Sequence, residues 1–221
     1  MDQQENTTNG YLWDGASNPL PWPSHTDMVV SLAKDGQAII DELDPVKAHL
    51  LHMAVGVSGE AAELLAAYFA SDNSLDVVNV VEELGDLEFF LAGIRVTLNV
   101  GHANVVAHDY EVSSDVGIHE GSIPAIFLSI AAGNLLDVIK KHAIYGKPLA
   151  VEEALSYMVD VEAHMGSIRG ALGFTRDQVL AVNGQKLGKR YVKGSYTNEA
   201  AIERADKVDT DANEAAARSS Q

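Results

Sequence analysis

The chain has 221 residues, of which 47% are hydrophobic, and a formal net charge of −17 at pH 7. The apolar content is sufficient for a substantial core, whereas the negative charge disfavours binding to nucleic acid, because that binding depends on Lys and Arg. The absence of cysteine excludes disulfides and thiolate metal sites, so a bound metal would need oxygen or imidazole ligands, which favours Mg²⁺ or Mn²⁺. We find neither an apolar run near the roughly 20 residues of a membrane-spanning helix nor a secretory signal pattern, and we therefore expect a cytoplasmic protein.

The predicted elements follow from the spacing of apolar residues and from Pro and Gly. Residues 1–24 are polar and then proline-rich, which predicts an irregular N-terminal arm. Helical spacing begins near Met28 and again at Pro45, and a further helix is predicted from about Leu75 to Leu98. The later elements are an exposed connection over 101–122, helices at about 123–143, 150–172 and 175–190, and a frayed tail over 206–221.

The absence of any convincing period-two alternation predicts an all-α fold. We expect one domain over residues 25–205. Its predicted parts are repeat one at about 46–100, the connection 101–122, repeat two at about 123–174, and a C-terminal helix and segment at 175–205.

A degenerate internal repeat appears when the sequence is shifted against itself by 74 residues. Gly59 then aligns with Gly133, and the register persists to the second half of the repeat. The other aligned pairs are Leu75 with Leu149, Asp86 with Asp160, Ile94 and Arg95 with Ile168 and Arg169, and Leu98 with Leu172. This pattern predicts a four-helix-bundle-like core made from two related helix hairpins, an internal pseudo-dimer, with extra flanking helices. Chance agreement between Leu-rich and Ala-rich helices is the alternative.

The two copies differ in their charges. The acidic residues of copy one and their counterparts are Glu60 and Asn134, Glu63 and Asp137, Glu83 and Tyr157, and Asp86 and Asp160. The basic segment of copy two and its counterparts are Lys140 and Ala66, Lys141 and Ala67, Tyr145 and Ser71, and Lys147 and Asn73.

The acids of copy one occupy otherwise apolar helices. Residues three apart share a helix face, so Glu60 and Glu63 form one carboxylate pair, and Glu83 and Asp86 form another. Burial of unpaired carboxylates is costly, and a cation is expected between them. If the helices pack antiparallel through a turn at 71–74, the four carboxylates converge into an oxygen site suited to Mg²⁺ or Mn²⁺. The alternative is that each pair lies on a solvated helix face.

These residues carry a resemblance to a known family. G-E-x-x-E-L followed by E-E-L-G-D, here at 59–64 and 82–86, resembles the all-α nucleoside triphosphate pyrophosphohydrolases of the MazG-like superfamily. DVIKKHAIYGKPL at 137–149 and NGQKLGKRYVKGSYTNEAAIERADK at 183–207 are similar to segments of its phage-type members. In the simple family pattern the basic segment directly follows the first acid pair, whereas here the two are divided between the repeats. We interpret this as a fused pseudo-dimer in which copy one supplies metal ligands and copy two supplies phosphate-binding cations.

The resemblance implies metal-dependent cleavage between the α and β phosphates of a nucleoside triphosphate, giving the monophosphate and pyrophosphate. The implied metal ligands are Glu60, Glu63, Glu83 and Asp86. Either Glu60 or Glu63 would be catalytic as the general base, with Glu82 as an outer-shell candidate. The base and sugar stay open, with dGTP or GTP as one candidate substrate, and a homo-oligomer such as a dimer is expected.

Further residues would bind the substrate. The implied phosphate-binding residues are Lys140, Lys141, Tyr145, Lys147, Asn183, Lys186 and Arg190. His52, with His49 near it, is a candidate for base recognition. The alternatives are a helix C-terminal charge complement for the two adjacent lysines, a solvated face for the last two cations, and a structural role for the histidines. Tyr191 is predicted to pack.

Two other functions compete with this hypothesis. The first is a non-catalytic helical interaction or regulatory protein derived from the enzyme. The second is a phosphoribosyl-ATP pyrophosphohydrolase, which shares the acid pattern.

Overall fold

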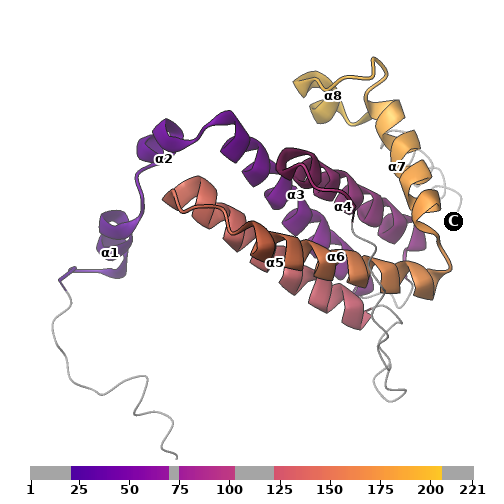
Figure 1. Ribbon diagram of the computed structural model, residues 1–221, viewed down its shortest axis with the longest axis horizontal. Helices are drawn as coiled ribbons and strands as arrows, with labels where there is room; N and C mark the ends of the chain where they lie inside the picture. Colours follow the sequence, from indigo (N-terminus) through magenta and orange to yellow (C-terminus); the bar gives the residue numbers. More distant parts are fainter. Residues whose placement is uncertain (1–20, 70–74, 103–121, 206–221) are drawn as a thin grey trace, which may run out of the picture. The chain divides into compact units, whose positions relative to one another are not determined.

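A computed structural model of the chain describes residues 21–69, 75–102 and 122–205 (Figure 1). Over these ranges the chain forms α-helices and no strand, so the predicted all-α fold is confirmed. The helices are α1 (His25–Leu32), α2 (Gly36–Glu42), α3 (Pro45–Tyr68), α4 (Val77–Leu98), α5 (Ser122–Tyr145), α6 (Val151–Leu172), α7 (Arg176–Arg190) and α8 (Asn198–Glu203). The predicted turn at 71–74, most of the N-terminal arm, most of the connection and the tail lie outside the described residues.

The chain divides into two compact units, Met1–Asp41 and Glu42–Gln221. In the first unit, the sequence predicted one continuous helix from Met28, and the structure instead has two short ones. The Ser24 side chain accepts a hydrogen bond from the backbone N–H of Asp27 and caps α1, and α1 ends where Ala33 takes an extended backbone. Asp35 accepts from the N–H of Ala38 at 3.1 Å and caps α2, so Asp35-Gly36 is a stop and restart signal that the periodicity concealed. The predicted domain limits stay predictions.

The second unit contains a four-helix bundle of α3, α4, α5 and α6, in which α3 packs against α4 and α5, and α5 packs against α6 (Figure 1). The helices α3 and α4 approach closely at two glycines. A Cβ on Gly56 would lie 2.3 Å from the Phe90 ring, and one on Gly93 would lie 2.2 Å from the Met53 sulfur. Because the later residue of α3 meets the earlier residue of α4, the two helices are antiparallel. The large fully buried side chains of the core include Leu50, Leu64, Leu84, Leu87, Leu91, Leu128, Leu135 and Met165.

The register of the internal repeat is preserved in the structure. Helices α4 and α6 begin 74 residues apart and also end 74 residues apart. Both end on a left-handed residue, Asn99 with φ of 54° and Gly173 with φ of 74°, whose N–H bonds back to the last turn. The predicted core of two related hairpins is therefore confirmed in the placement of its helices.

Buried ion pairs join the two hairpins reciprocally. On one side, Arg176 donates to both carboxylate oxygens of Glu88 at 2.8 and 2.7 Å, and a guanidinium nitrogen of Arg169 lies 3.5 Å from the same carboxylate. On the other side, Arg95 pairs with Glu162, and His102 Nε2 lies 3.7 Å from the Glu162 carboxylate. The corresponding residues 88 and 162, 95 and 169, and 102 and 176 are each 74 apart. An internal twofold pseudosymmetry produces this reciprocity, as in an isologous dimer interface.

Two helices of the bundle, α3 and α5, are both long and strongly apolar. By length and composition alone, α3 and α5 could each cross a membrane, so the expectation that no segment reaches that length is wrong for these two helices. Core helices of other proteins meet the same test, and the most apolar windows of α3 and α5 are 33% and 50% buried inside the protein. These two helices are therefore weak evidence for a membrane span.

Candidate metal centre

The four predicted acids line one cavity of about 340 Å³, to which α3 contributes Glu60 and Glu63, and α4 contributes Glu83 and Asp86. Carboxylate oxygens of Glu60, Glu83 and Asp86 lie within 4.8 Å of one another. Glu63 is exposed and stands outside this group of three while lining the same cavity. The antiparallel packing of α3 on α4 thus brings together carboxylates that are about 20 residues apart in the sequence.

Burial sets the protonation of this cluster. Glu83 is only 5% exposed, and burial raises its pKa to about 8, with a further contribution from its hydrogen bond with Glu60 and from the charges of Glu60 and Glu63. Burial also raises the pKa of Glu60, while its hydrogen bond with Glu83 acts in the opposite direction. A protonated Glu83 donating to an ionised Glu60 explains both effects. In the absence of a cation, the two carboxyl groups therefore retain a proton at neutral pH.

Helix α7 supplies two buried partners to Asp86. Asn183 Nδ2 donates to Asp86 Oδ1 at 2.7 Å, and Lys186 Nζ pairs with Asp86 Oδ2 and lies 3.9 Å from the Glu82 carboxylate. Asn183 is 6% exposed and Lys186 is 8% exposed. A Cβ at Gly85 would lie 2.7 Å from Asn183 Cβ, so glycine beside the acid lets α7 approach this closely. Asn183 and Lys186 were predicted to bind substrate, and in the structure both contact Asp86, a predicted metal ligand.

The donor set fits a hard divalent cation. Three carboxylates converge, one of them buried, and Lys186 pairs with one of the three, Asp86. Oxygen donors of this kind suit Mg²⁺ or Mn²⁺. The raised pKa values of Glu60 and Glu83 are what burial of carboxyl groups close to one another produces.

Further residues of the acidic cavity come from α4 and from the C-terminal segment. Arg190 at the end of α7 was predicted, whereas Asn79 of α4 and Arg204 after α8 were not, and all three line the cavity. Arg204 lies inside the segment 183–207 on which the family resemblance was noted. That resemblance was the only available signal, because a single arginine in a polar stretch usually lies on a solvated surface.

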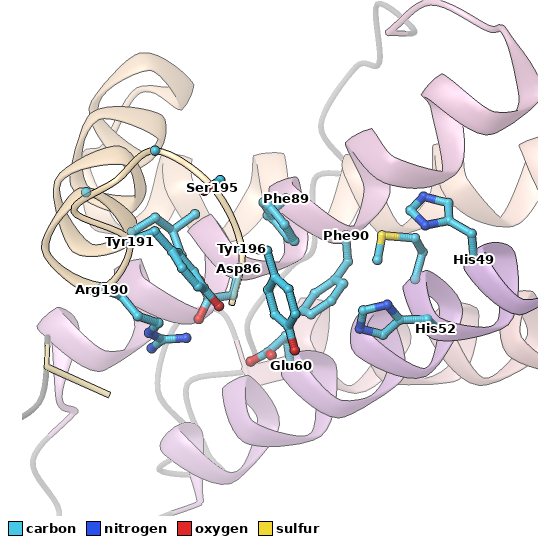
Figure 2. A pocket seen from close by; sticks show the side chains of 14 residues that line it. His49, His52, Glu60, Asp86, Phe89, Phe90, Arg190, Tyr191, Ser195 and Tyr196 are labelled. Atoms are coloured by element: carbon cyan, nitrogen blue, oxygen red, sulfur yellow. The ribbon is translucent and has the colours of Figure 1, made fainter. Parts of the chain in front are cut away.

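A larger cavity of about 720 Å³ adjoins the acidic one and shares Glu60, Asp86 and Arg190 with it (Figure 2). His52, the predicted base-recognition residue, lies in its wall together with His49. The remaining lining residues are Met53, Phe89, Phe90, Leu187, Gly188, Tyr191, Gly194, Ser195 and Tyr196. Tyr191, which was predicted to pack, lies in the cavity wall with its ring beside that of Tyr196. Neither phenylalanine nor Tyr196 was predicted, because aromatic residues on a helix or turn carry no signal that separates core from cavity.

The basic residues of copy two are not part of either cavity. Lys140 and Lys141 both pair with Asp137 at 2.6 Å. Tyr145 and Lys147 are exposed, and the Lys147 carbonyl accepts from His142 Nδ1 at 2.7 Å.

The distance along α5 explains this separation. Ser129 donates to the Ala61 carbonyl at 3.0 Å, level with the acids, and Lys140 is eleven residues farther along α5, a rise of about 16 Å. The structure of one chain therefore does not bring Lys140, Lys141, Tyr145 or Lys147 to the acidic cavity. Their contact with a substrate bound there stays a prediction that this arrangement does not support.

The equivalent position in the second hairpin has lost the carboxylate cluster. The counterparts of the four acids are Asn134, Asp137, Tyr157 and Asp160, and in the described ranges the potential metal-binding group is the one formed by Glu60, Glu83 and Asp86. The two lysines beside Asp137 lower its pKa to about 2, so its charge is already compensated from its own helix.

Comparison of the chain with known protein families, with curated proteins and with solved structures finds no match.

Proposed function

We propose that the protein is a metal-dependent nucleoside triphosphate pyrophosphohydrolase that cleaves between the α and β phosphates. The observation that supports this most is the junction of two cavities, one acidic and one aromatic, that share Glu60 and Asp86. A divalent cation at the acids and a planar base among the aromatic rings would account for both. The family resemblance of the acid motifs points to the same reaction.

Glu60, Glu83 and Asp86 would hold the cation, with Glu63 at the edge of the same cavity. A divalent cation supplies neutralisation of phosphate charge and acidification of an attacking water. Glu63 is the better candidate for the general base, because it is exposed to the cavity and stands outside the convergent group. Glu60 is the alternative, although its hydrogen bond with Glu83 already engages it.

The phosphate chain would be held by arginines. Arg190 at the end of α7 and Arg204 directly after α8 both line the acidic cavity. A guanidinium can bind two phosphate oxygens at once, which suits a departing pyrophosphate. Lys186, which pairs with Asp86 and lines the same cavity, would place a further positive charge near the phosphates.

The test is a panel of ribo- and deoxyribonucleoside triphosphates and phosphoribosyl-ATP with Mg²⁺ or Mn²⁺, scored for monophosphate and pyrophosphate. We expect release of pyrophosphate that stops in EDTA. Glu63→Gln should lower kcat by about 10²–10⁴-fold, the usual contribution of a general base. Asp137→Asn, the same change at the equivalent position of the second hairpin, should leave kcat unchanged.

Three outcomes would contradict the proposal. Release of orthophosphate would mean that another bond is cleaved. Hydrolysis confined to phosphoribosyl-ATP would assign the other enzyme class. A protein that neither binds Mn²⁺ nor hydrolyses any member of the panel would support the non-catalytic helical protein.

A further inference from the structure

The turn that follows α7 forms one wall of the larger cavity, and the rings it carries face the rings of the bundle (Figure 2). We propose that this cavity is a nucleobase subsite and that Tyr191 and Tyr196 determine affinity for the base. Binding of the phosphates next to this subsite rests on the proposed function, because it requires a cation at the acidic residues. Binding of the base depends instead on the aromatic side chains of the cavity.

The bundle wall consists of aromatic rings held edge to face. The Phe89 and Phe90 ring centroids are 5.3 Å apart at 84°, and those of His52 and Phe90 are 6.1 Å apart at 72°. Edge-to-face contacts cover only part of the faces of these rings, and Phe90 also packs against the core. Phe89 is 50% exposed, so the protein leaves apolar ring surface in water, and a cluster of such surface usually marks a binding site.

The opposite wall is fixed by backbone hydrogen bonds. Tyr191 N–H donates to the Leu187 carbonyl and Gly194 N–H donates to the Tyr191 carbonyl, both at 2.8 Å. Gly194 has φ of 68°, a backbone conformation that glycine adopts without strain. The chain therefore reverses directly after α7 and carries its second tyrosine back toward the first.

The turn also orients the second tyrosine. The Tyr191 and Tyr196 ring centroids are 5.9 Å apart with an angle of 39°. The Tyr196 hydroxyl donates to the Asn198 side chain at 2.9 Å, which holds the ring at the start of α8 while 68% of the residue stays exposed. A ring that is anchored at its hydroxyl and open on its face is suited to stacking.

The charge distribution selects the ligand. The charged residues in the lining of this cavity are Glu60, Asp86 and Arg190, and the same three also line the acidic cavity. The aromatic end is otherwise apolar, with His49, His52 and Ser195 as hydrogen-bonding groups. A ligand that matches both ends is planar and uncharged at one end and polyanionic at the other, which describes a nucleotide. Stacking on aromatic side chains tolerates any base, so the subsite would require a base without dictating which one.

The test compares ligands with and without a base. Dissociation constants are measured by calorimetry, with Mg²⁺, for a purine and a pyrimidine nucleoside monophosphate and for inorganic tripolyphosphate. Tyr191→Leu and Tyr196→Leu should each weaken the nucleotides by about tenfold, because one base–aromatic stack contributes about 1–3 kcal/mol and 1.4 kcal/mol is tenfold. Binding of tripolyphosphate should change less than about twofold, because it has no base to stack.

Matched variants separate ring stacking from other effects. Tyr196→Phe keeps the ring and loses only the exposed hydrogen bond from the Tyr196 hydroxyl to Asn198. Its affinity for nucleotides should therefore stay within about threefold of the wild type. Phe127→Leu removes an exposed aromatic ring of α5 that lines neither cavity and should leave the affinity for nucleotides unchanged. If a turn variant does not fold, Phe89→Leu on the opposite wall gives the same readout.

Saturation-transfer NMR provides a readout that does not need hydrolysis, because base protons in this subsite receive saturation from the protein and lose it in the Leu variants. Pyrophosphate release with equal affinity for nucleotide and tripolyphosphate would overturn the subsite and leave the enzyme. Base-dependent binding without hydrolysis would overturn the enzyme and leave the subsite. Leu variants that change self-association in sedimentation, and not ligand binding, would show that the cavity is an interface and overturn the proposal.

Discussion

The two hairpins of the bundle share a backbone and differ in chemistry. Helices α4 and α6 have equivalent bounds and equivalent left-handed caps at a separation of 74 residues. Three carboxylates from α3 and α4 nevertheless lie close together, whereas the described residues of α5 and α6 form no such carboxylate group. The two hairpins therefore share the helix placement that forms the bundle. They differ in the carboxylates that could bind a metal ion.

The contrast is sharpest between two kinds of buried acid. The pairs of Glu88 with Arg169 and Glu162 with Arg95 repeat across the pseudo-twofold relation and join the hairpins. Glu83 is buried in a hydrogen bond with another acid, Glu60, and its counterpart is the neutral Tyr157. Buried acids paired with arginine therefore join the hairpins on both sides, whereas this buried acid paired with a second acid belongs to the first hairpin.

The largest effect on stability is expected from removing the ion pairs that occur in both hairpins. Glu88→Ala leaves Arg169 buried without its carboxylate, and Glu162→Ala does the same to Arg95. We expect each to lower the free energy of unfolding by about 3–5 kcal/mol, the usual cost of an unpaired buried charge. Urea denaturation at pH 7 measures both.

A double-mutant cycle provides the control. Adding Arg95→Met to Glu162→Ala removes the orphaned charge and should recover part of the lost stability. If Glu88→Ala and Glu162→Ala each cost less than about 1 kcal/mol, the reciprocal pairs do not join the hairpins as the pseudosymmetry suggests.

The second prediction concerns the asymmetric part and follows from the pKa of Glu83, about 8. A cation must displace this proton, so the apparent affinity for Mn²⁺ should rise about tenfold per pH unit up to pH 8 and then level off. Calorimetry in buffers of different ionisation enthalpy measures the proton released. Glu83→Gln should abolish this release, and Tyr157→Phe at the equivalent position should preserve it.

The same pKa predicts a trend in the stability of the metal-free protein. The folded pKa of Glu83 lies above its ordinary value of 4.5, so the folded state binds the proton more tightly than the unfolded state does. Its contribution to stability is full below pH 4.5 and is lost as pH rises through 8. Glu83→Gln should flatten this part of the pH profile, and an unchanged slope would mean that the group is not buried as described.

The smallest effect is expected from the lysines of the second hairpin. Lys140 and Lys141 pair with Asp137 and line neither cavity, so Lys140→Ala with Lys141→Ala should leave KM and kcat for a nucleoside triphosphate unchanged. Arg190→Ala should raise KM, because Arg190 lines both cavities. A rise in KM for the lysine variant would instead support the role that the family resemblance implies, with the lysines reaching a substrate outside the arrangement of one chain.

The sequence was informative about these elements to different degrees. The start of α3 followed from Pro45, and the end of α4 followed from the apolar spacing through Leu98. The break at 33–35 was missed, because a single capping Asp in a periodic stretch competes poorly with the period. The short helix α8 was missed because six residues carry little periodicity.

The candidate site divides in the same way. Spacing of three along a helix predicted that Glu60 and Glu63, and Glu83 and Asp86, form local pairs, and that prediction needs only helix geometry. The family resemblance implied that Lys186 binds substrate, and the packing of α7 against Gly85 brings this lysine to Asp86. Contacts between distant elements depend on how helices pack, which local periodicity does not encode.

By itself, the sequence determined an all-α chain, a duplicated helix hairpin and an excess of carboxylates in the first copy, because each of these is a pattern of residue types along the chain. Only the tertiary structure decided that three of those carboxylates converge, that α7 fixes one of them, and that Tyr191 and Tyr196 line one cavity with Phe90. The physical reason is that burial and proximity arise from packing between elements, and the pKa of Glu83 and the aromatic cavity exist only once α3, α4 and the turn after α7 are in place.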